Sequence, residues 1–545
     1  MKGLMMDTPL LITSLIRFAA EYHGDTEIVS RTLEGPLHRY TYSDAYQRIQ
    51  KLANALHKFG VRPGDRVATL AWNGYRHFEL YYAISSMGAV CHTINPRLFH
   101  EQIDYIVNHA DDRVIFIDLP FVELVEELQK KLTTVEAYVV MTDAAHMPET
   151  TLKEAVDYES FIADETDSYD WPMLDENAAA SLCYTSGTTG NPKGVLFSHR
   201  STVLHSFSIC HADATLALSS STTVLPVVPM FHVHAWGIPY GAVMSGSKLV
   251  FAGAKLDGKS LYELFESERV TITAGVPTVW LGLIEYMKSS GKKFSHLDSI
   301  VIGGSAAPLS MIKDLEEGFG VSVMQAWGMT EISPIGTNGR LKGKYQNLPA
   351  DERHVIKTAQ GRAKFGVDLK IVDDEGRYLP HDGTTSGELL VHGPWVAQAY
   401  FKDEEASKLS HDNEGWMRTG DVGTIDADGH LRLIDRTKDL IKSGGEWISS
   451  IELENAATGH PAVAEAAAIA VAHPKWTERP LLFVVPLGEA ELDGEEIMEF
   501  LKDKVAKWWL PDDIIFVGAL PHTATGKIHK LRLREQYRDY KLPTA

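Results

Sequence analysis

The sequence predicts an α/β fold, because helical and strand patterns alternate over most of its length. Residues 42–60 repeat apolar side chains with helical periodicity and stop at Gly60, and residues 66–72 have an apolar strand pattern. A helical pattern at 78–90 and a buried strand pattern at 113–118 follow. Such alternation is typical of largely parallel sheets covered by helices.

The pattern changes after about residue 360. Short strand patterns are now broken by Asp-Gly and Glu-Gly turns. We therefore expect a large domain over 1–434, a charged hinge at 435–440 and a small α+β domain over 441–545. The small domain is expected to hold two strands and one helix, at 464–472, 481–488 and 495–508.

Composition excludes several classes of protein. The 545 residues are 44% hydrophobic and 23% charged, which is ordinary for a globular chain with several cores. A formal net charge of −21 disfavours nucleic acid as a partner, although a local basic pocket for one nucleotide is compatible with it. No run approaches ~18 uncharged apolar residues, so we expect no transmembrane helix and no stable membrane insertion.

The cysteines and the N-terminus indicate a cytoplasmic location. The chain has three cysteines, Cys91, Cys183 and Cys210. Their spacing suits neither zinc nor a disulfide framework, which favours a reducing compartment. The N-terminal apolar run is flanked by Asp7 and Arg17 and has no clear small-residue cleavage site. We interpret it as an amphipathic helix that begins after residue 9, not as a signal peptide.

The segment 184–194, YTSGTTGNPKG, predicts a loop that binds a polyphosphate. It follows an apolar strand pattern at 178–184, so we expect it to lead from that strand to a further strand or helix. Glycines let the backbone approach a ligand, hydroxyls add donors, and Lys193 adds positive charge. A Walker loop is excluded because Pro192, not glycine, precedes the lysine. A solvated surface loop is the alternative for this composition.

Further motifs follow this segment in the order of a known family. Together they make the chain resemble the adenylate-forming superfamily, which comprises acyl-CoA synthetases, luciferases and the adenylation domains of peptide synthetases. The motifs that carry the resemblance are YTSGTTGNPKG, WGMTE at 327–331, GEL at 387–389, TGD at 419–421, DRTKD at 435–439, KSGGE at 442–446 and TGK at 525–527. The match covers essentially the whole chain. It most resembles bacterial medium- and long-chain fatty acyl-CoA synthetases, including relatives that act on methylthiopropionate.

The resemblance implies a fold and a reaction. The fold is a large N-terminal domain of layered α/β subdomains plus a distorted β-barrel, then a hinge and a small mobile C-terminal domain. In the reaction, a carboxylic acid attacks the α-phosphorus of ATP to give an acyl-adenylate and pyrophosphate. CoA then attacks the acyl carbonyl and AMP leaves. Mg²⁺ is implied as cofactor, and a homodimer is plausible by the same resemblance.

The resemblance also assigns residues to the phosphates and the metal. The loop residues implied to grip the β- and γ-phosphates are Thr185, Ser186, Gly187, Thr188, Thr189, Gly190 and Lys193. Thr185 and Glu331 would bind Mg²⁺, which prefers hard oxygen ligands. Thr330 would bind the α-phosphate.

The nucleoside residues follow in the same way. Trp327 falls where the family usually has tyrosine, beside the adenine, and an indole is also a flat stacking surface; a core aromatic is the alternative. Asp421 would accept from both ribose hydroxyls, with Arg436 adding a ribose or phosphate contact, although an isolated TGD is more often a turn. Three more residues are implied at the adenine pocket: Gly304, Gln325 and Ala326.

Two lysines of the small domain match family lysines. Lys527 would neutralise charge between the attacking carboxylate and the α-phosphate, unless it is an ordinary solvated lysine. Lys442, with Trp447, belongs by resemblance to the opposite face of that domain. Rotation about Lys438 would let each lysine serve in turn.

The segment 228–236, VPMFHVHAW, is expected to line the acyl site. Amino-acid-activating domains typically have Asp after the Phe, but this chain has His232, and a buried substrate ammonium without a partner is costly. His232 would orient the acyl carboxylate, unless it is a satisfied core histidine. Val233 would line the site, and Trp236 resembles the gating tryptophan of a long-chain relative. Trp280 is either tunnel wall or plain packing.

We therefore predict an AMP-forming acyl-CoA synthetase for medium- or long-chain fatty acids. Tunnel depth cannot be read from one sequence, so 3-methylthiopropionate and aryl acids stay open as substrates, as does a luciferase-like oxidative activity. A non-catalytic nucleotide-binding scaffold is the alternative from a different class. The intact loop, Glu331 and Lys527 argue against it.

Overall fold

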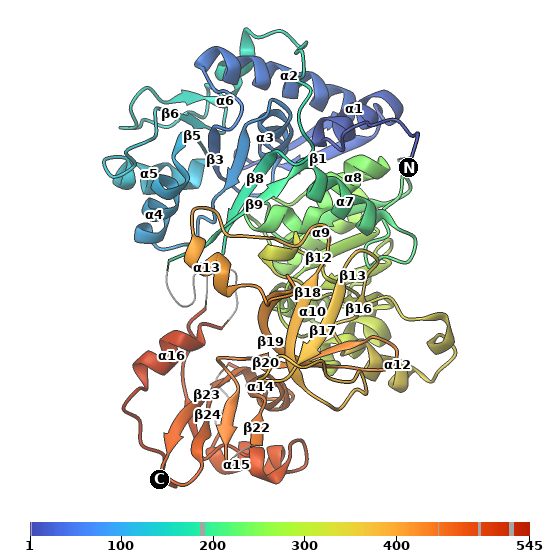
Figure 1. Cartoon of the computed structure of the whole chain (residues 1–545), viewed down its shortest axis with the longest axis vertical. Helices are drawn as coiled ribbons and strands as arrows, with labels where there is room; N and C mark the ends of the chain where they lie inside the picture. Colours follow the sequence, from blue (N-terminus) through green and yellow to red (C-terminus); the bar gives the residue numbers. More distant parts are fainter. Residues whose placement is uncertain (2, 186–190, 445, 489–491, 523–527) are drawn as a thin grey trace.

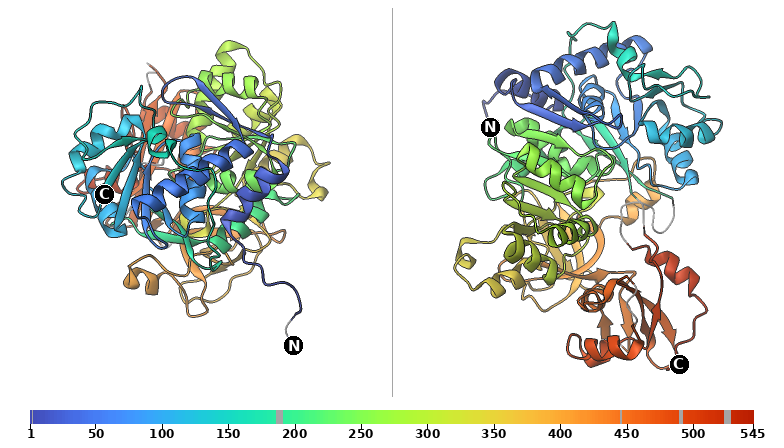
Figure 2. Two further views of the ribbon diagram at one scale, coloured as in Figure 1. Left: turned by 90° about the horizontal axis from the view of Figure 1, so that it is seen from above. Right: turned by 180° about the vertical axis from the view of Figure 1, so that it is seen from behind.

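The computed structural model describes residues 1, 3–185, 191–444, 446–488, 492–522 and 528–545. Figure 1 shows an elongated molecule, with the N-terminal two thirds of the chain above and the C-terminal segment below. The view from behind in Figure 2 shows the same division. A large N-terminal domain and a small C-terminal domain are therefore present, as expected.

Two seven-stranded sheets form most of the N-terminal domain. Sheet 1 has the order β7 (Val156–Asp157), β6 (Ala137–Val140), β5 (Asp112–Ile117), β3 (Arg66–Leu70), β4 (Val90–Thr93), β8 (Ala179–Tyr184) and β9 (Gly194–Ser198). Sheet 2 has the order β14 (Ser322–Gln325), β13 (Ser299–Ile302), β12 (Ile272–Gly275), β10 (Thr223–Pro226), β11 (Lys248–Phe251), β1 (Glu27–Arg31) and β2 (Leu37–Thr41). Neighbouring strands are parallel except β8–β9 and β1–β2.

Helix α3 (Tyr75–Ser86) lies between the two sheets, and all 12 of its residues are buried. Phe78 contacts Phe251 of sheet 2, while the Ser85 hydroxyl donates to the Ala180 carbonyl of sheet 1. A helix that is buried on all sides suits such a central layer. The other helices of this domain are α1 (Ile12–Tyr22), α2 (Tyr42–Phe59), α4 (His100–Ala110), α5 (Val122–Leu128), α6 (Tyr158–Ala163), α7 (His199–Cys210), α8 (Ile238–Ser245), α9 (Gly258–Glu268), α10 (Pro277–Ser290), α11 (Leu309–Lys313), α12 (Ala350–Lys357) and α13 (Glu404–Leu409).

The expected distorted β-barrel is instead an open antiparallel sheet in the described part of the chain. Its strands are β17 (Asp368–Val372), β18 (Gly387–His392), β19 (Met417–Ile425) and β20 (Leu431–Arg436). The short pair β15 (Thr337–Asn338) and β16 (Arg362–Ala363) reaches it through one bridge, Arg362 to His430. Two-residue strands are too short to close a barrel.

The C-terminal segment is α+β, as expected. Its sheet has the order β22 (Glu446–Ile448), β21 (Ile441–Ser443), β24 (Thr477–Pro486) and β23 (Val463–His473), with β25 (Asp513–Phe516) paired to β24. Its helices are α14 (Ser450–Thr458), α15 (Gly494–Lys502) and α16 (Lys530–Gln536). The helix expected over 495–508 ends early, at Lys502, and Val505 and Leu510 beyond it pack against the same core as α15.

Element boundaries in the N-terminal domain follow the sequence signals closely. Helix α2 ends at Gly60, whose φ of 107° is left-handed. Helix α1 begins at Ile12 and α3 at Tyr75, within three residues of expectation. No described helix is long and apolar enough to cross a membrane.

Candidate active site

A cavity of about 1560 Å³ opens at the carboxyl ends of the sheet 2 strands and extends to the small domain. Residues just after β10, β12, β13 and β14 line it, among them Val227, Val276, Gly304 and Ala326. Ligands of open α/β sheets bind at this edge because the connecting loops diverge there.

The structure brings most of the predicted site residues to this cavity. They are Thr185, Lys193, His232, Val233, Trp236, Gly304, Ala326, Trp327, Thr330, Glu331, Asp421, Arg436 and Lys438. Gln325 lies behind the cavity wall, where its side chain accepts from the Ala307 N–H and donates to the Lys357 carbonyl, both at 2.9 Å. Six predicted residues lie outside the described residues: Ser186, Gly187, Thr188, Thr189, Gly190 and Lys527.

The phosphate loop connects two antiparallel strands, β8 and β9, and its two ends are hydrogen-bonded together. The Thr185 N–H donates to the Lys193 carbonyl at 2.9 Å, and the Lys193 N–H donates to the Thr185 hydroxyl at 3.2 Å. The two ends of the segment therefore stay paired where they leave sheet 1, which fixes Lys193 at the cavity.

Tyr400 joins this loop to Glu331, and sequence analysis missed it. The Lys193 ammonium lies 4.8 Å from the centre of the Tyr400 ring, and the Tyr400 hydroxyl donates to Glu331 Oε1 at 2.7 Å. Glu331 is 6% exposed, and this burial raises the pKa of its carboxyl while the Tyr400 hydrogen bond opposes the rise. Nothing in the sequence distance between QAYF at 398–401 and WGMTE at 327–331 indicates this contact.

The nucleoside side of the cavity is organised by Asp421. The Trp327 indole N–H donates to one carboxylate oxygen at 2.8 Å, and Arg436 Nε contacts the other at 2.6 Å. A carboxylate has about four lone-pair sites, so Asp421 keeps acceptor capacity for a ligand. Gly336 covers one side of the indole, where an added Cβ would lie 2.8 Å from the ring.

The acyl segment adopts an unusual backbone. Residues 233–236 have φ between 41° and 57°, and Gly237 has φ 76°. Consecutive left-handed non-glycine residues are strained, so packing must impose this turn. Trp236 packs against Gly303, where an added Cβ would lie 2.7 Å from the indole. This contact places Trp236 between the acyl segment and the loop that carries Gly304.

His232, His234 and Trp280 differ in how deeply their side chains are buried. His232 is half-buried and lines the cavity. His234 is buried 3.7 Å from the Cys183 sulfur, and burial lowers its pKa to about 3, so it stays neutral. Trp280 is fully buried in the core of sheet 2 and away from the cavity, which supports the plain packing interpretation.

Arg97 is a second residue that sequence analysis missed. Its guanidinium lies 5.1 Å from the Trp72 ring and 6.0 Å from the Phe231 ring, at the cavity wall. The residue is exposed, but partial desolvation beside these rings lowers its pKa, and among the described residues it has no carboxylate partner. It therefore offers a cation to an anionic group beside the acyl segment.

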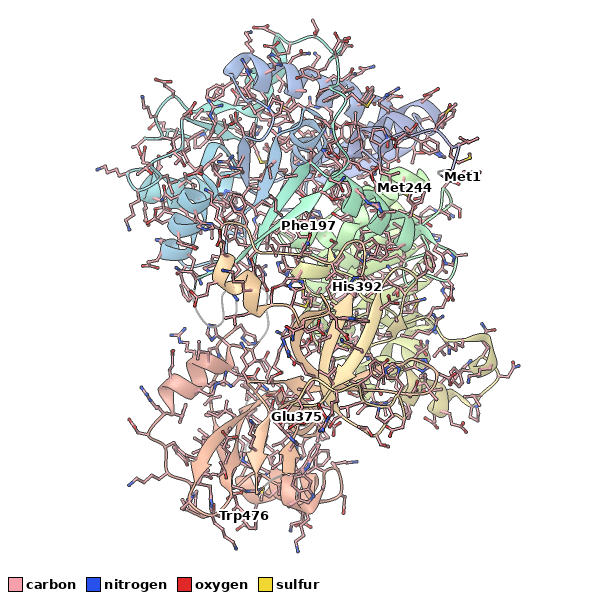
Figure 3. The ribbon with its side chains drawn as sticks, viewed as in Figure 1. Met1, Phe197, Met244, Glu375, His392 and Trp476 are labelled. Carbon is pink, nitrogen blue, oxygen red and sulfur yellow. The ribbon has the colours of Figure 1, made fainter. Side chains whose placement is uncertain are left out.

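The two lysine-bearing motifs of the small domain, at 442–446 and 525–527, belong to different parts of it. Lys442 pairs with Trp447 across the β21–β22 hairpin, with its ammonium 4.9 Å from the ring centre, and neither lines the cavity. The same hairpin contacts Trp476 through the Gly444 N–H, and Figure 3 places Trp476 at the far end of the molecule. By contrast, His522 and Ile528, which flank residues 523–527, line the cavity.

Residues 16–401 match the family described as AMP-binding enzyme, and residues 452–527 match the AMP-binding enzyme C-terminal domain. The chain belongs to the AMP-binding enzyme family. This confirms the resemblance drawn from the motifs.

Relatives match along the whole chain. A 3-methylmercaptopropionyl-CoA ligase of Ruegeria lacuscaerulensis is 49% identical over 99% of both chains. A medium-chain-fatty-acid–CoA ligase of Ectopseudomonas oleovorans is 50% identical over 100% of this chain and 99% of its own. The crystal structure of an anthranilate CoA ligase in complex with anthranoyl-AMP has a TM-score of 0.87 at 24% identity, covering 99% of both chains, which confirms the fold.

The Trp327–Asp421 hydrogen bond gives a prediction for AMP binding. Trp327→Phe keeps a flat ring but removes the N–H donor, so we expect AMP to bind roughly tenfold more weakly. Trp327→Ala also removes the stacking surface and should cost at least roughly a further tenfold. Titration calorimetry with AMP measures both, with Trp416→Phe as the control. Wild-type affinity in Trp327→Phe would show that the indole N–H does not matter.

Proposed function

We propose that the protein is an AMP-forming acyl-CoA synthetase for medium- or long-chain fatty acids. The observation that supports this most is that one cavity joins the Trp327–Asp421–Arg436 cluster to an acyl segment without acidic side chains. An ammonium-bearing substrate would find no partner in Val228–Trp236, whereas an aliphatic acid needs none. The CoA ligases named among the relatives agree with this chemistry.

The geometry suggests how each residue acts. Lys193 and Thr185 would hold the terminal phosphates, Thr330 the α-phosphate, and Asp421 the ribose hydroxyls. His232, with Arg97 close to Phe231, would orient the acid for attack on the α-phosphorus. Lys527 would neutralise charge in that step, so catalysis rests mainly on positioning and electrostatics.

A magnesium site fits Glu331 and Thr185. Glu331 has one oxygen bonded to Tyr400 and leaves the other for a hard cation, and Thr185 lines the same cavity. Magnesium there would compensate the charge of the polyphosphate.

We also propose that the two half-reactions use two orientations of the small domain. The hinge would be 435–440, between domains 1–434 and 441–545. In the present orientation the residues flanking 523–527 line the cavity and Lys442 does not. This arrangement suits adenylation, and rotation about Lys438 would bring Lys442 and Trp447 to the site for thioester formation. We also propose that the protein is cytoplasmic and forms a homodimer.

The second candidate is a ligase for a short thioether acid. It is favoured by the 49% identity to a 3-methylmercaptopropionyl-CoA ligase, because the identity to the medium-chain enzyme is almost the same, at 50%. The depth of the acyl site distinguishes the two, because each buried CH₂ adds about 0.8 kcal/mol to binding.

The proposal predicts acyl-CoA formation from ATP, Mg²⁺, CoA and a free acid. Acids from propionate to palmitate, 3-methylthiopropionate and benzoate are supplied in turn, and acyl-CoA is measured by chromatography. We expect kcat/KM to rise with chain length to a maximum among medium or long chains. A maximum at 3-methylthiopropionate would select the short-acid candidate. No thioester from any acid, despite ATP binding, would favour the scaffold.

The two lysines should separate the half-reactions. Lys527→Ala should reduce ATP–pyrophosphate exchange by about 10²–10³-fold, because it removes charge stabilisation of the adenylation step. Lys442→Ala should leave exchange near wild type and reduce transfer of the acyl group to CoA. Lys502→Ala, on the exposed face of α15, is the matched control. Full activity of both variants in both assays would disprove these roles.

Tyr400→Phe should change the pH dependence. The hydroxyl stabilises the Glu331 carboxylate, so its loss raises the pKa of Glu331. A protonated Glu331 cannot bind magnesium, so the acid limb of the kcat/KM profile should move to higher pH. We expect kcat/KM to fall about tenfold at the low-pH end of that limb. Tyr378→Phe, at an exposed tyrosine, is the control. An acid limb that does not move would show that Tyr400 does not influence the metal site.

A further inference from the structure

A cluster of ionisable side chains lies outside the cavity, between α12 and the turn η3 (Asp314–Gly318). Glu317, Asp351 and His354 each present one ligand atom, and these atoms all lie within 4.8 Å of one another. None of the three lines the active-site cavity. Figure 1 shows α12 at the right-hand edge of the molecule, on the outer side of the N-terminal domain.

His354 is held in one orientation by Glu316. The imidazole is 2% exposed, and its Nε2 lies 3.0 Å from Glu316 Oε2. The other oxygen of Glu316 accepts from the Val323 N–H at 2.8 Å and from the Lys357 ammonium. Because Glu316 is an acceptor, it keeps the imidazole proton on Nε2 and leaves a lone pair on Nδ1. Metal-binding histidines are commonly oriented by a carboxylate in this way.

The lone pair of His354 Nδ1 faces other acceptors. Nδ1 is buried without a hydrogen-bond partner and lies 3.5 Å from Glu317 Oε1. The Asp351 carboxylate closes the group from the same helix as His354. Three lone-pair atoms around one point repel one another unless a cation lies between them, and a buried polar atom without a partner calls for an explanation.

We propose that Glu317, Asp351 and His354 bind one divalent transition-metal ion, with Zn²⁺ preferred and water completing its shell. One imidazole nitrogen and two carboxylates are ordinary zinc ligands. The imidazole disfavours Mg²⁺ and Ca²⁺, which take oxygen ligands. Glu317 and Asp351 are exposed, which gives the ion and its water a path from solvent.

Two neighbouring lysines reduce the negative charge around this site but do not occupy the position of the ion. Lys313 donates to Asp351 Oδ1 at 2.5 Å, which leaves the second carboxylate oxygen for the ion. Its charge weakens cation binding, so the affinity should be lower than that of a closed structural zinc site. Lys357 is bonded to Glu316 and neutralises that carboxylate.

The bound ion would clip α12 to the turn that precedes β14. Helix α12 ends at Lys357, whose carbonyl accepts from Gln325, and Glu316 accepts from Val323 of β14. The clip therefore stabilises the support of Gln325, and the ion should raise the melting temperature. At a hundredfold excess over Kd we expect a rise of about 2 °C for a chain of this size.

The test is a zinc titration of tag-free, chelator-treated, nucleotide-free protein by calorimetry. We expect one Zn²⁺ per chain in the wild type, and at least about a tenfold loss of affinity in the double variant Glu317→Gln, Asp351→Asn. Both residues are exposed, so that variant should fold. Glu352→Gln removes one of the two charges that the double variant removes, at an exposed position of α12 outside the cluster, and should keep wild-type affinity and the thermal shift. X-ray absorption should show one nitrogen and carboxylate oxygens as ligands.

A negative result has a definite meaning. No zinc binding by the wild type, or equal binding by the wild type and the double variant, would overturn the proposal. His354 would then be an imidazolium paired with Glu316 and Glu317.

Discussion

The Asp421 carboxylate is the constraint on which the active-site cavity depends. It is 4% exposed, and a buried charge must be hydrogen-bonded or paired. Its partners come from the turn after β14 and from the end of β20, so Trp327, Asp421 and Arg436 must meet although they are far apart in the sequence. The turn after β14, the β17–β20 sheet and the segment that begins at Arg436 are thereby held in one arrangement.

The rest of the cavity follows from how the two large sheets are stacked. Parallel strands of sheet 2 deliver the acyl segment and the Gly304 and Trp327 loops to one edge. The phosphate loop comes instead from an antiparallel hairpin of sheet 1. Helix α3 separates the sheets, so its buried side chains hold β8 and β9 apart from the strands of sheet 2. Tyr400 then completes the junction by touching both Lys193 and Glu331.

Sequence patterns anticipated the parts of this structure that depend on local signals. Periodicity and Gly60 located α2, and the motif order located Trp327, Asp421 and Arg436 at one cavity. Tyr400 and Arg97 were missed because their roles come from ring contacts across the fold, which no spacing encodes. The left-handed turn at 233–237 was equally hidden, since tertiary packing imposes it on residues with no turn preference.

The reorientation of the small domain that we propose is compatible with the contacts of residues 435–440. Arg436 and Thr437 bind Asp421 and Gly420 of the large domain, while Asp439 pairs with Arg534 of the small domain. The proposed rotation about Lys438 would keep both sets. It would break the bonds from Ser450 to Asp435 and from Ser449 to Ile434, and those from the N–H groups of residues 439 and 440 to the Arg436 carbonyl. Hydrogen bonds to a charged group contribute about 1.5–3 kcal/mol each, and water replaces much of that when they open. Because Asp421 and its partners Trp327 and Arg436 all lie before Lys438, the second orientation that we propose would leave the Asp421 contacts intact.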